Sequence, residues 1–409
     1  MLRRRTLIHL SITFALLVIA CAVFYWKFVR PFFEMTGGGE IPQELRDPGV
    51  RVGEGLLSRG EFVKLRPPGF LGDYAPGIGG AHDVAVGELD GQPGPDVVVA
   101  GTYGARVFDL AGAERSEITY GFETKEVKLG PFSSSSPKMM LGDFQIIDID
   151  GDGTCEYLGR GSLDGAAVFD HGGRVLWSYG AYEEGKTSID DMAAGDLNGD
   201  GTVEFVTAWD IIRLHDRHGG KIWERPGDGS SHHIEVADAD GDGKPEILAS
   251  GGRHLIVTDI KGKPVRMVEL PFYFWRFSVC ARPDGRKQLL AVEDGHVWTF
   301  DSKAESVGRL PAPLAELKVE PRQTLIGDIS EVSVYQSEGA WVKLDAARPE
   351  ALAVITQYVV MDRSVLYVYD SSGALVYMEV LPEECYSVAA LPAEEGRPQE
   401  FLVGCENTV

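Results

Sequence analysis

Three short acidic segments recur in the chain at similar spacing, and this repeat limits the fold more than any other feature. They begin at Asp148, Asp196 and Asp238 and share the pattern Asp-x-Asp/Asn-x-Asp-Gly-x-x-Glu. Successive copies start 48 and 42 residues apart. A short apolar run lies on each side of every copy, which is typical of two β-strands joined by a turn. Each copy therefore predicts one β-hairpin of a repeating structural unit.

A second pattern lies between the acidic segments and adds another hairpin to each repeat. It consists of a short apolar run followed by Asp-x-x-Gly, and its copies begin at Val107, Val168, Leu214, Val257 and Val368. Repeats of about 40–50 residues with four strands each are typical of β-propeller blades. Weaker copies of the acidic segment, such as those at 88–96 and 280–288, bring the number of repeats to seven. The sequence therefore predicts an all-β, seven-bladed β-propeller of four-stranded blades.

The two ends of the predicted propeller, which covers 51–409, belong to one blade. The last inner hairpin has no outer hairpin after it, whereas residues 51–66 resemble an outer hairpin with no inner one before it. We therefore expect 51–66 to pair with 385–404 and close the ring. Such closure covers sheet edges that would otherwise favour aggregation.

The amino-terminal part of the chain predicts a membrane anchor. Leu7 to Trp26 is almost wholly apolar, and twenty helical residues span about 30 Å. The segments are a cytoplasmic tail at 1–6, a transmembrane helix at 7–29 and a tether at 30–50. Three arginines before the span favour an internal amino terminus, and hence a single-pass membrane protein with its propeller outside the cytoplasm. The alternative is a cleaved signal with Cys21 lipidated, which also places the propeller outside the cytoplasm.

The acidic segments predict three calcium sites. Side-chain oxygens at positions 1, 3, 5 and 9, with the carbonyl of position 7, suit a hard cation of flexible coordination. The segments are not EF-hands, because position 12 is not glutamate and the flanking segments are strands. An ion would also offset the repulsion between the carboxylates, although a solvated acidic turn is the alternative. The predicted ligands are Asp148, Asp150, Asp152, Thr154 and Glu156; Asp196, Asn198, Asp200, Thr202 and Glu204; and Asp238, Asp240, Asp242, Lys244 and Glu246.

These three loops resemble those of the FG-GAP repeat family, the integrin-α-type propellers and their bacterial relatives, including membrane-anchored members. The resemblance is specific for the copies at 148, 196 and 238 and extends more weakly over about 51–409. It implies a seven-bladed propeller with calcium in the loops that join the two innermost strands of a blade. The outer hairpins also look like those of quinoprotein-type propellers, which we interpret as shared blade geometry.

A second candidate site lies where the innermost strands begin. Each of its residues stands five positions before the start of an acidic loop or of its degenerate copy. In a propeller these positions converge on the mouth of the central channel, where they could hold a cation or a polar ligand. The alternative is that strand entries are simply polar and solvated. The residues are Asp83, Asp143, Asp191, His233, Trp275 and Tyr386.

Composition and motifs favour a binding function. The formal net charge is −23, which repels phosphate backbones and makes nucleic acid an unsuitable partner. The sequence contains no recognised catalytic motif, so we predict no catalytic residue. The prediction is a ligand-binding or interaction scaffold for a protein or glycan outside the cytoplasm. The alternative is an extracytoplasmic carbohydrate-active or quinone-dependent enzyme that uses the axial funnel.

Two cysteines near the carboxyl end are placed to face each other. If Val388 lies opposite Leu402 in an antiparallel pair, facing residue numbers sum to 790, and Cys385 then faces Cys405. A cross-strand pair of this kind can form a disulfide. The alternative is two unrelated small apolar residues.

Overall fold

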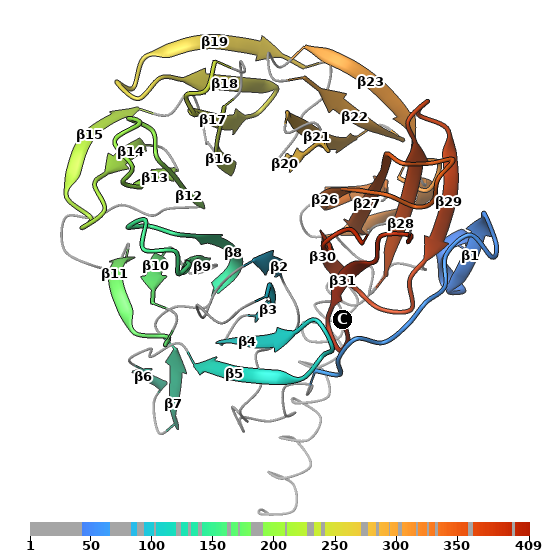
Figure 1. Ribbon diagram of the computed structural model, residues 1–409, viewed down its shortest axis with the longest axis horizontal. Helices are drawn as coiled ribbons and strands as arrows, with labels where there is room; N and C mark the ends of the chain where they lie inside the picture. Colours follow the sequence, from blue (N-terminus) through green and yellow to red (C-terminus); the bar gives the residue numbers. More distant parts are fainter. Residues whose placement is uncertain are drawn as a thin grey trace, which may run out of the picture.

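Six antiparallel β-sheets of four or five strands are arranged in a ring in the computed structural model, so the fold is an all-β propeller (Figure 1). Neighbouring sheets pack through buried apolar clusters; one of them joins Leu158 and Val168 of one blade to Phe205 of the next. The described residues are 43–65, 83–87, 94–101, 104–119, 124–129, 132–137, 141–161, 165–170, 172–180, 191–208, 211–226, 233–238, 242–270, 277–283, 286–293, 295–301, 305–315, 318–324, 327–331, 334–358, 363–394 and 397–409.

Each of the six sheets contains four consecutive strands placed in chain order, as in two successive hairpins. The four-stranded sheets are β2 to β5 (Asp83–Gly87, Asp96–Gly101, Gly104–Asp109, Glu114–Thr119), β8 to β11 (Leu141–Ile147, Glu156–Gly161, Gly165–Phe169, Val175–Gly180), β12 to β15 (Asp191–Gly195, Glu204–Ala208, Ile211–His215, Lys221–Pro226), β16 to β19 (His233–Ala237, Glu246–Gly251, His254–Thr258, Pro264–Glu269) and β20 to β23 (Ser278–Ala281, Lys287–Glu293, His296–Phe300, Ser306–Pro311). The five-stranded sheet contains β26 to β29 (Val334–Val342, Ala351–Tyr358, Ser364–Asp370, Leu375–Val380) and β1 (Gly49–Val52).

Smaller elements complete the described part of the chain. They are the helix α3 (Gln43–Arg46) and three two-stranded sheets: β6 and β7 (Thr124–Leu129, Phe132–Pro137), β24 and β25 (Lys318–Thr324, Gly327–Glu331), and β30 and β31 (Cys385–Ala390, Phe401–Cys405).

The prediction of seven four-stranded blades is wrong, because the described residues form six sheets of that size. The seventh predicted unit is the two-stranded hairpin β30–β31, which packs between β26 and β2. The physical reason lies in residues 406–409, which turn back instead of continuing into an outer hairpin. Lys64 and Thr408 form an isolated bridge, and the Leu65 N–H donates to the Asn407 carbonyl (2.9 Å).

The amino-terminal segment contacts the ring at two places. Strand β1 pairs antiparallel with β29, and the backbone of Phe62 and Val63 exchanges hydrogen bonds with Val409. Leu65 and Val409 are buried in one apolar cluster with Val97 of the first blade. The segment boundaries proposed from the sequence at 6, 29 and 50 stay predictions.

The membrane prediction is corrected by the structure. Within the described part of the chain, no helix is long and apolar enough to cross a bilayer. The apolar segment 7–29, with Cys21, lies outside the described residues.

Each outer hairpin turns around an aspartate that holds the backbone of the turn. Asp216 shows the pattern: its Oδ1 accepts the N–H groups of His218 and Gly220, both at 2.8 Å. Gly219 has a φ of +81°, a conformation that residues with a Cβ rarely adopt. A Cβ at this position would lie 1.6 Å from Nε1 of Trp177 in the preceding blade. This glycine therefore permits both the turn and the contact between blades.

Among the residues that the structure describes, the same turn occurs in five outer hairpins. Its aspartates are Asp109, Asp170, Asp216, Asp259 and Asp370, and its glycines, three residues later, have φ between +76° and +82°. Gly262 similarly approaches Trp223 of the blade before it. The Asp-x-x-Gly pattern in the sequence thus sets the turn of the outer hairpin and, at Gly219 and Gly262, its contact with the preceding blade.

Substitution of Gly219 by alanine should be much more destabilising than the same change at Gly55. Both glycines have a φ of +81°, but no atom lies within 4 Å of a Cβ at Gly55. We expect Gly55→Ala to cost about 1 kcal/mol from backbone strain alone, and Gly219→Ala about 3 kcal/mol because Trp177 must also move. Urea unfolding measures both; equal losses would show that the Trp177 contact has no energetic role.

The predicted disulfide is confirmed: Cys385 and Cys405 face each other in the β30–β31 pair, and their sulfurs are bonded at 2.03 Å. The register that led to the prediction was wrong by one residue, because Val388 lies opposite Val403. A bulge between Cys385 and Ser387 restores the cysteine pairing.

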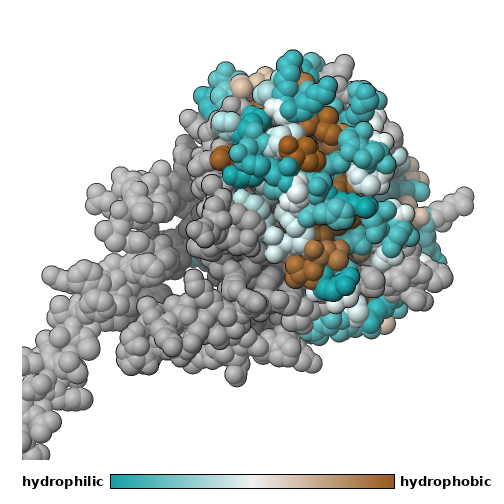
Figure 2. All heavy atoms as spheres, turned by 90° about the vertical axis from the view of Figure 1, so that its left-hand side faces the viewer, coloured by the Kyte–Doolittle hydropathy of each residue, from teal (hydrophilic) through white to brown (hydrophobic). Residues whose placement is uncertain are grey.

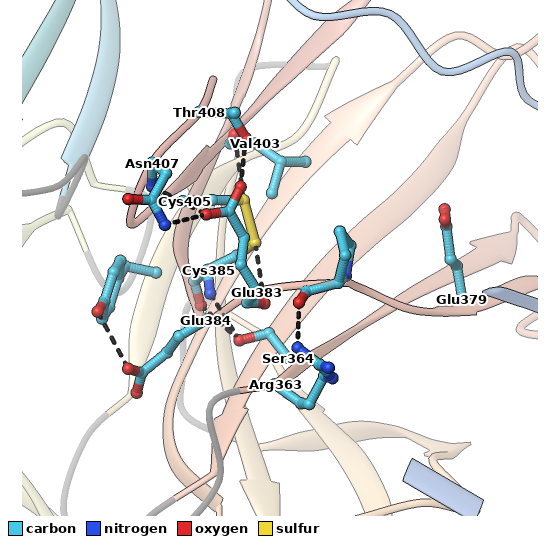
Figure 3. Close-up of a disulfide and its surroundings, with 12 residues drawn as sticks. Arg363, Ser364, Glu379, Glu383, Glu384, Cys385, Val403, Cys405, Asn407 and Thr408 are labelled. Atoms are coloured by element: carbon cyan, nitrogen blue, oxygen red, sulfur yellow. Dashed lines mark hydrogen bonds between the residues drawn. A yellow bond between two sulfur atoms is a disulfide. The ribbon is translucent and has the colours of Figure 1, made fainter. Parts of the chain in front are cut away.

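Polar contacts fix the surroundings of this disulfide (Figure 3). The Ser364 hydroxyl donates to the Cys385 carbonyl and accepts its N–H, both at 2.8 Å, which ties β28 to β30. Glu383 accepts the backbone and side-chain N–H groups of Asn407 at 2.9 Å each, and the hydroxyl of Thr408. The disulfide and Glu383 together hold the open end of the hairpin, where β30 begins and β31 ends.

Removing the disulfide should destabilise the closing hairpin. The bond closes a loop with a sequence separation of 20, for which the chain-entropy model gives about 3 kcal/mol. We expect this loss in the Cys385→Ser/Cys405→Ser double variant, and no further loss when that variant is reduced. Thiol counting on the denatured, unreduced chain should find three of the five cysteines free; five free thiols would refute the bond.

Candidate metal sites

The first acidic loop joins β8 to β9 and is organised around Asp148. Its Oδ1 accepts the N–H of Gly151 at 2.7 Å, and its Oδ2 accepts the N–H of Gly153 at 3.0 Å. Gly151 and Gly153 have φ of +76° and +88°, so the chain can curl around this carboxylate only where glycine stands. The loop is thereby held in a shape that turns several oxygens inward.

Three carboxylates converge in this loop. Asp148, Asp150 and Glu156 each offer one oxygen, and these oxygens all lie within 4.8 Å of one another. Glu156 is buried and accepts the N–H of Ile149 at 2.8 Å, while Asp150 is exposed. Three oxygen ligands on one side of a tight loop are the donor set that calcium binds, with water and carbonyl oxygens completing the shell. The residues present therefore fit a calcium ion.

The second acidic loop, between β12 and β13, has the same internal hydrogen bonds. Asp196 accepts from Gly199 at 2.7 Å and from Gly201 at 3.0 Å, as Asp148 does in the first loop. Glu204 accepts the N–H of Leu197 at 3.0 Å and the side-chain amide of Asn198 at 2.6 Å. The amide at position 3 thus contacts the position 9 carboxylate directly.

The third loop, between β16 and β17, is described in part. Asp238 Oδ2 accepts the N–H of Gly243 at 2.9 Å, and Asp242 accepts that of Lys244 at 2.8 Å. Glu246 begins β17, and Asp240 lies outside the described residues. The described half repeats the geometry of the first two loops.

The residues at positions 5 and 7 have a local role in all three loops. The aspartate at position 5 accepts the backbone N–H at position 7: Asp152 from Thr154 at 2.7 Å, and Asp200 from Thr202 at 2.8 Å. The Thr202 hydroxyl also donates to Asp200, and this bond lowers the pKa of Asp200. The structure therefore brings positions 1, 3 and 9 together in the first loop and places position 5 at its exposed edge.

The first two loops lie on the same rim of the ring. The Val203 N–H, at the end of the second loop, donates to the Ile149 carbonyl of the first at 3.4 Å. Sequence reasoning missed a second link between these blades. Gln145 of β8 donates to the Ala194 carbonyl and accepts the Ala194 N–H, both at 2.9 Å. Its only signal in the sequence is an amide within an apolar strand.

The glutamate at position 9 lies in surroundings that disfavour its ionised form. Burial raises the pKa of Glu156, and the carboxylates of Asp150, Asp152 and Asp148 raise it further against the hydrogen bond from Ile149. Burial also raises the pKa of Glu204. A cation in either loop would remove this penalty by favouring the ionised glutamate.

Two of the predicted axial residues are buried against each other. Asp191 and His233 are buried, and Oδ2 of Asp191 lies 2.6 Å from Nδ1 of His233 and accepts the Ile234 N–H at 2.8 Å. This pair joins β12 to β16, and His233 also packs edge-on against Phe277 with ring centroids 4.7 Å apart. The pair therefore lies between blades rather than at a solvated strand entry.

The other described axial residues lie at or near the start of β2, β8 and β30. Asp83 begins β2, and Asp143 lies opposite Arg160 in the β8–β9 register. Tyr386 donates to Glu384 at 3.1 Å, and burial raises its pKa. Trp275 lies outside the described residues, so an axial ligand site stays a prediction.

Comparisons with known proteins identify no family. No family model and no curated protein matches the chain. The Neurospora crassa Pan2 WD40 domain is 13% identical, covers 84% of this chain and 94% of its own, and has a TM-score of 0.48. BBS1N, solved in complex with ARL6DN, is 10% identical, with coverages of 80% and 92% and a TM-score of 0.48.

A third solved structure, BamB from Moraxella catarrhalis, is 14% identical, covers 78% of this chain and 82% of its own, and has a TM-score of 0.37. At such TM-scores the matches add no argument, and the strand arrangement of the chain itself carries the propeller assignment. Membership of the FG-GAP family is not confirmed.

Stability without calcium should fall as pH rises above the normal glutamate range. A glutamate whose pKa is raised by folding stabilises the fold below its unfolded pKa of 4.5, and this contribution is lost as pH rises through the folded pKa. In EDTA, the melting temperature should therefore fall less between pH 5 and pH 7 in Glu156→Gln than in the wild type. Glu54→Gln, a change in an exposed turn, is the control and should behave as the wild type; an unchanged pH response in Glu156→Gln would contradict the assignment.

Proposed function

We propose that the chain is a calcium-stabilised β-propeller of the FG-GAP type that serves as a protein-interaction scaffold. The observation that carries the proposal is the convergence of Asp148, Asp150 and Glu156 within 4.8 Å. The matching hydrogen bonds around Asp196 and Asp238 support equivalent sites in the next two blades. Bound calcium would supply positive charge to each loop and reduce the repulsion among its carboxylates.

The position of the loops suits a stabilising role. Each described loop connects the two innermost strands of its blade, and the loops that begin at Asp148 and Asp196 are hydrogen-bonded to each other. An ion in one loop would therefore fix the end of its own hairpin and the seam with the next blade. Because the carboxylates of an empty loop repel one another, bound calcium should raise the stability of the fold. We assign it no catalytic role.

The scaffold function is supported by the burial of the two polar residues that the sequence placed at the axial site. Asp191 and His233 contact each other between blades, so they support packing and do not present an open pair of reactive groups. Repeated blades give a rigid body with many independent edges and loops, which suits the binding of other proteins. Protein is the partner class we propose.

Calcium should raise the melting temperature of the chain, and EDTA should lower it. Calcium at 100 times its dissociation constant adds about 2.7 kcal/mol for each occupied site. Asp150→Asn should remove the part that belongs to the first loop, whereas Glu54→Gln, which removes an exposed carboxylate from a turn outside the loops, should leave the response unchanged. Isothermal titration calorimetry gives the number of sites.

The outcome that contradicts the metal assignment is an identical melting temperature with calcium and with EDTA. The scaffold is tested by affinity capture from cells that make the chain, with Glu156→Gln as the matched bait. A protein partner should be retained by the chain in calcium, and the comparison with EDTA and with the variant measures how far the loops contribute to that binding. Turnover of a glycan or quinone substrate by the purified chain would contradict the scaffold assignment.

A further inference from the structure

One outer edge of the ring is occupied by an added strand from the chain itself. Strand β1 lies antiparallel to β29, with Gly49 opposite Val380 and Val52 opposite Met378. The outer edge of a blade in this protein thus accepts a fifth, extended strand through backbone hydrogen bonding, as in β-strand addition by peptides. In Figure 1, β1 lies outside β29 at the right-hand edge of the ring.

Strand β19 repeats the local geometry of β29. The Leu381 N–H donates to the Ser364 carbonyl at 2.9 Å, and at the equivalent place the Leu270 N–H donates to the Arg253 carbonyl at 2.8 Å. Both strands follow an Asp-x-x-Gly turn, and the tenth residue after the turn aspartate is Val380 in β29 and Glu269 in β19.

The backbone of β19 therefore directs hydrogen-bonding groups to the outside of the sheet. Alternate residues of an antiparallel strand direct their N–H and C=O groups to opposite sides. The Leu270 N–H bonds inward, to the carbonyl of Arg253 just before β18. The N–H and C=O groups of Glu269 and Met267 therefore point away from β18. No described strand pairs with this side of β19.

Two other outer strands are blocked at the same position. The tenth residue after the turn aspartate is Pro226 in β15 and Pro311 in β23. Proline has no N–H to donate, and it is a common means of preventing pairing at a sheet edge. Strand β19 has Glu269 there, so it keeps the donor that its neighbours lack.

The surface beside this edge is apolar along β19 and basic at the turn that precedes it. Val265 and Met267 are each 55% exposed, the highest values among the large hydrophobic residues that the structure describes. On the side of the ring where β15 lies, hydrophobic atoms form separate patches among hydrophilic ones (Figure 2). Lys261 and Lys263 are exposed at the turn that leads into β19, although the chain as a whole carries −23.

The orientation of β1 tells which end of a guest strand meets these lysines. An antiparallel guest runs from Glu269 toward Val265, so its carboxyl-terminal residues reach the turn that contains Lys261 and Lys263. The Asp259 carboxylate in the same turn accepts the N–H groups of both lysines at 3.0 and 2.9 Å. Arg266 is paired with Glu305 of the next blade at 3.2 Å.

We propose that the outer edge of β19 binds an extended segment of a partner protein as an antiparallel strand, with alternating apolar residues followed by acidic ones. The proposal deepens the scaffold function and rests on it, but it does not require calcium. Backbone pairing supplies the affinity, Val265 and Met267 cover the apolar side chains of the guest, and the two lysines select its acidic end.

Fluorescence anisotropy tests the proposal with the full chain and a labelled peptide, Thr-Val-Thr-Val-Thr-Asp-Glu-Asp. We expect saturable binding that is at least tenfold weaker for the peptide with the reversed order of residues. Glu269→Pro copies the proline of β15 and β23 and should weaken binding at least tenfold. Ile222→Ser, which removes a similarly exposed apolar side chain from the blocked strand β15, should leave binding unchanged.

A second variant keeps the test decisive if Glu269→Pro unfolds. Lys261→Glu/Lys263→Glu changes exposed residues only and should weaken binding of the acidic peptide at least tenfold. Equal binding of both peptides, or binding that survives both variants, would overturn the proposal. So would a dimer in light scattering that Glu269→Pro dissociates, because a second copy would then occupy the edge.

The measurements are made in calcium and in EDTA. Peptide binding without a calcium effect on melting would support the edge site and contradict the metal assignment. A calcium effect without peptide binding would support the metal assignment and overturn the edge site.

Discussion

Neighbouring blades in this propeller are held in position by a repeated contact between the glycine of an outer turn and a bulky side chain of another segment. Gly219 meets Trp177, Gly262 meets Trp223, and Gly112 meets Phe62, which lies beside the carboxyl end of the chain. The turn aspartates hold the glycines at positive φ, and the absent Cβ leaves room for the ring. Because this contact sets the position of one blade on the next, the acidic loops and the outer edges take regular positions around the axis.

The hairpins were predictable because their signals are local. Asp-x-x-Gly and Asp-x-Asp-x-Asp-Gly each fix a turn with its own side chain, so the turns at Asp216 and Asp148 follow from a few adjacent residues. The number of blades was not predictable, since weak repeats do not tell whether a hairpin gains outer strands. Residues 406–409 pair with 62–65 and leave β30–β31 two-stranded, a choice made by contacts distant in the sequence. The cysteine pair followed from strand pairing even though the register was off by one.

The metal loops show what a pattern can and cannot specify. The pattern places Asp148, Asp150 and Asp152 at alternate positions and treats them alike. In the structure Asp150 turns toward Glu156, whereas Asp152 caps Thr154 at the exposed edge. The axial prediction failed to foresee that Asp191 and His233 bury each other between two blades, because burial depends on the packing of Phe277 from a third. Sequence reasoning finds donor atoms, but only tertiary packing decides which of them share a site.

The central claim, that these loops hold calcium, is tested most directly by a crystal structure of the chain grown with calcium and measured for anomalous scattering. The account predicts an anomalous peak between Asp148, Asp150 and Glu156, within about 2.3–2.6 Å of their oxygens, and equivalent peaks in the loops that begin at Asp196 and Asp238. Loops without a peak at saturating calcium, with their carboxylates hydrogen-bonded only to the backbone, would contradict it.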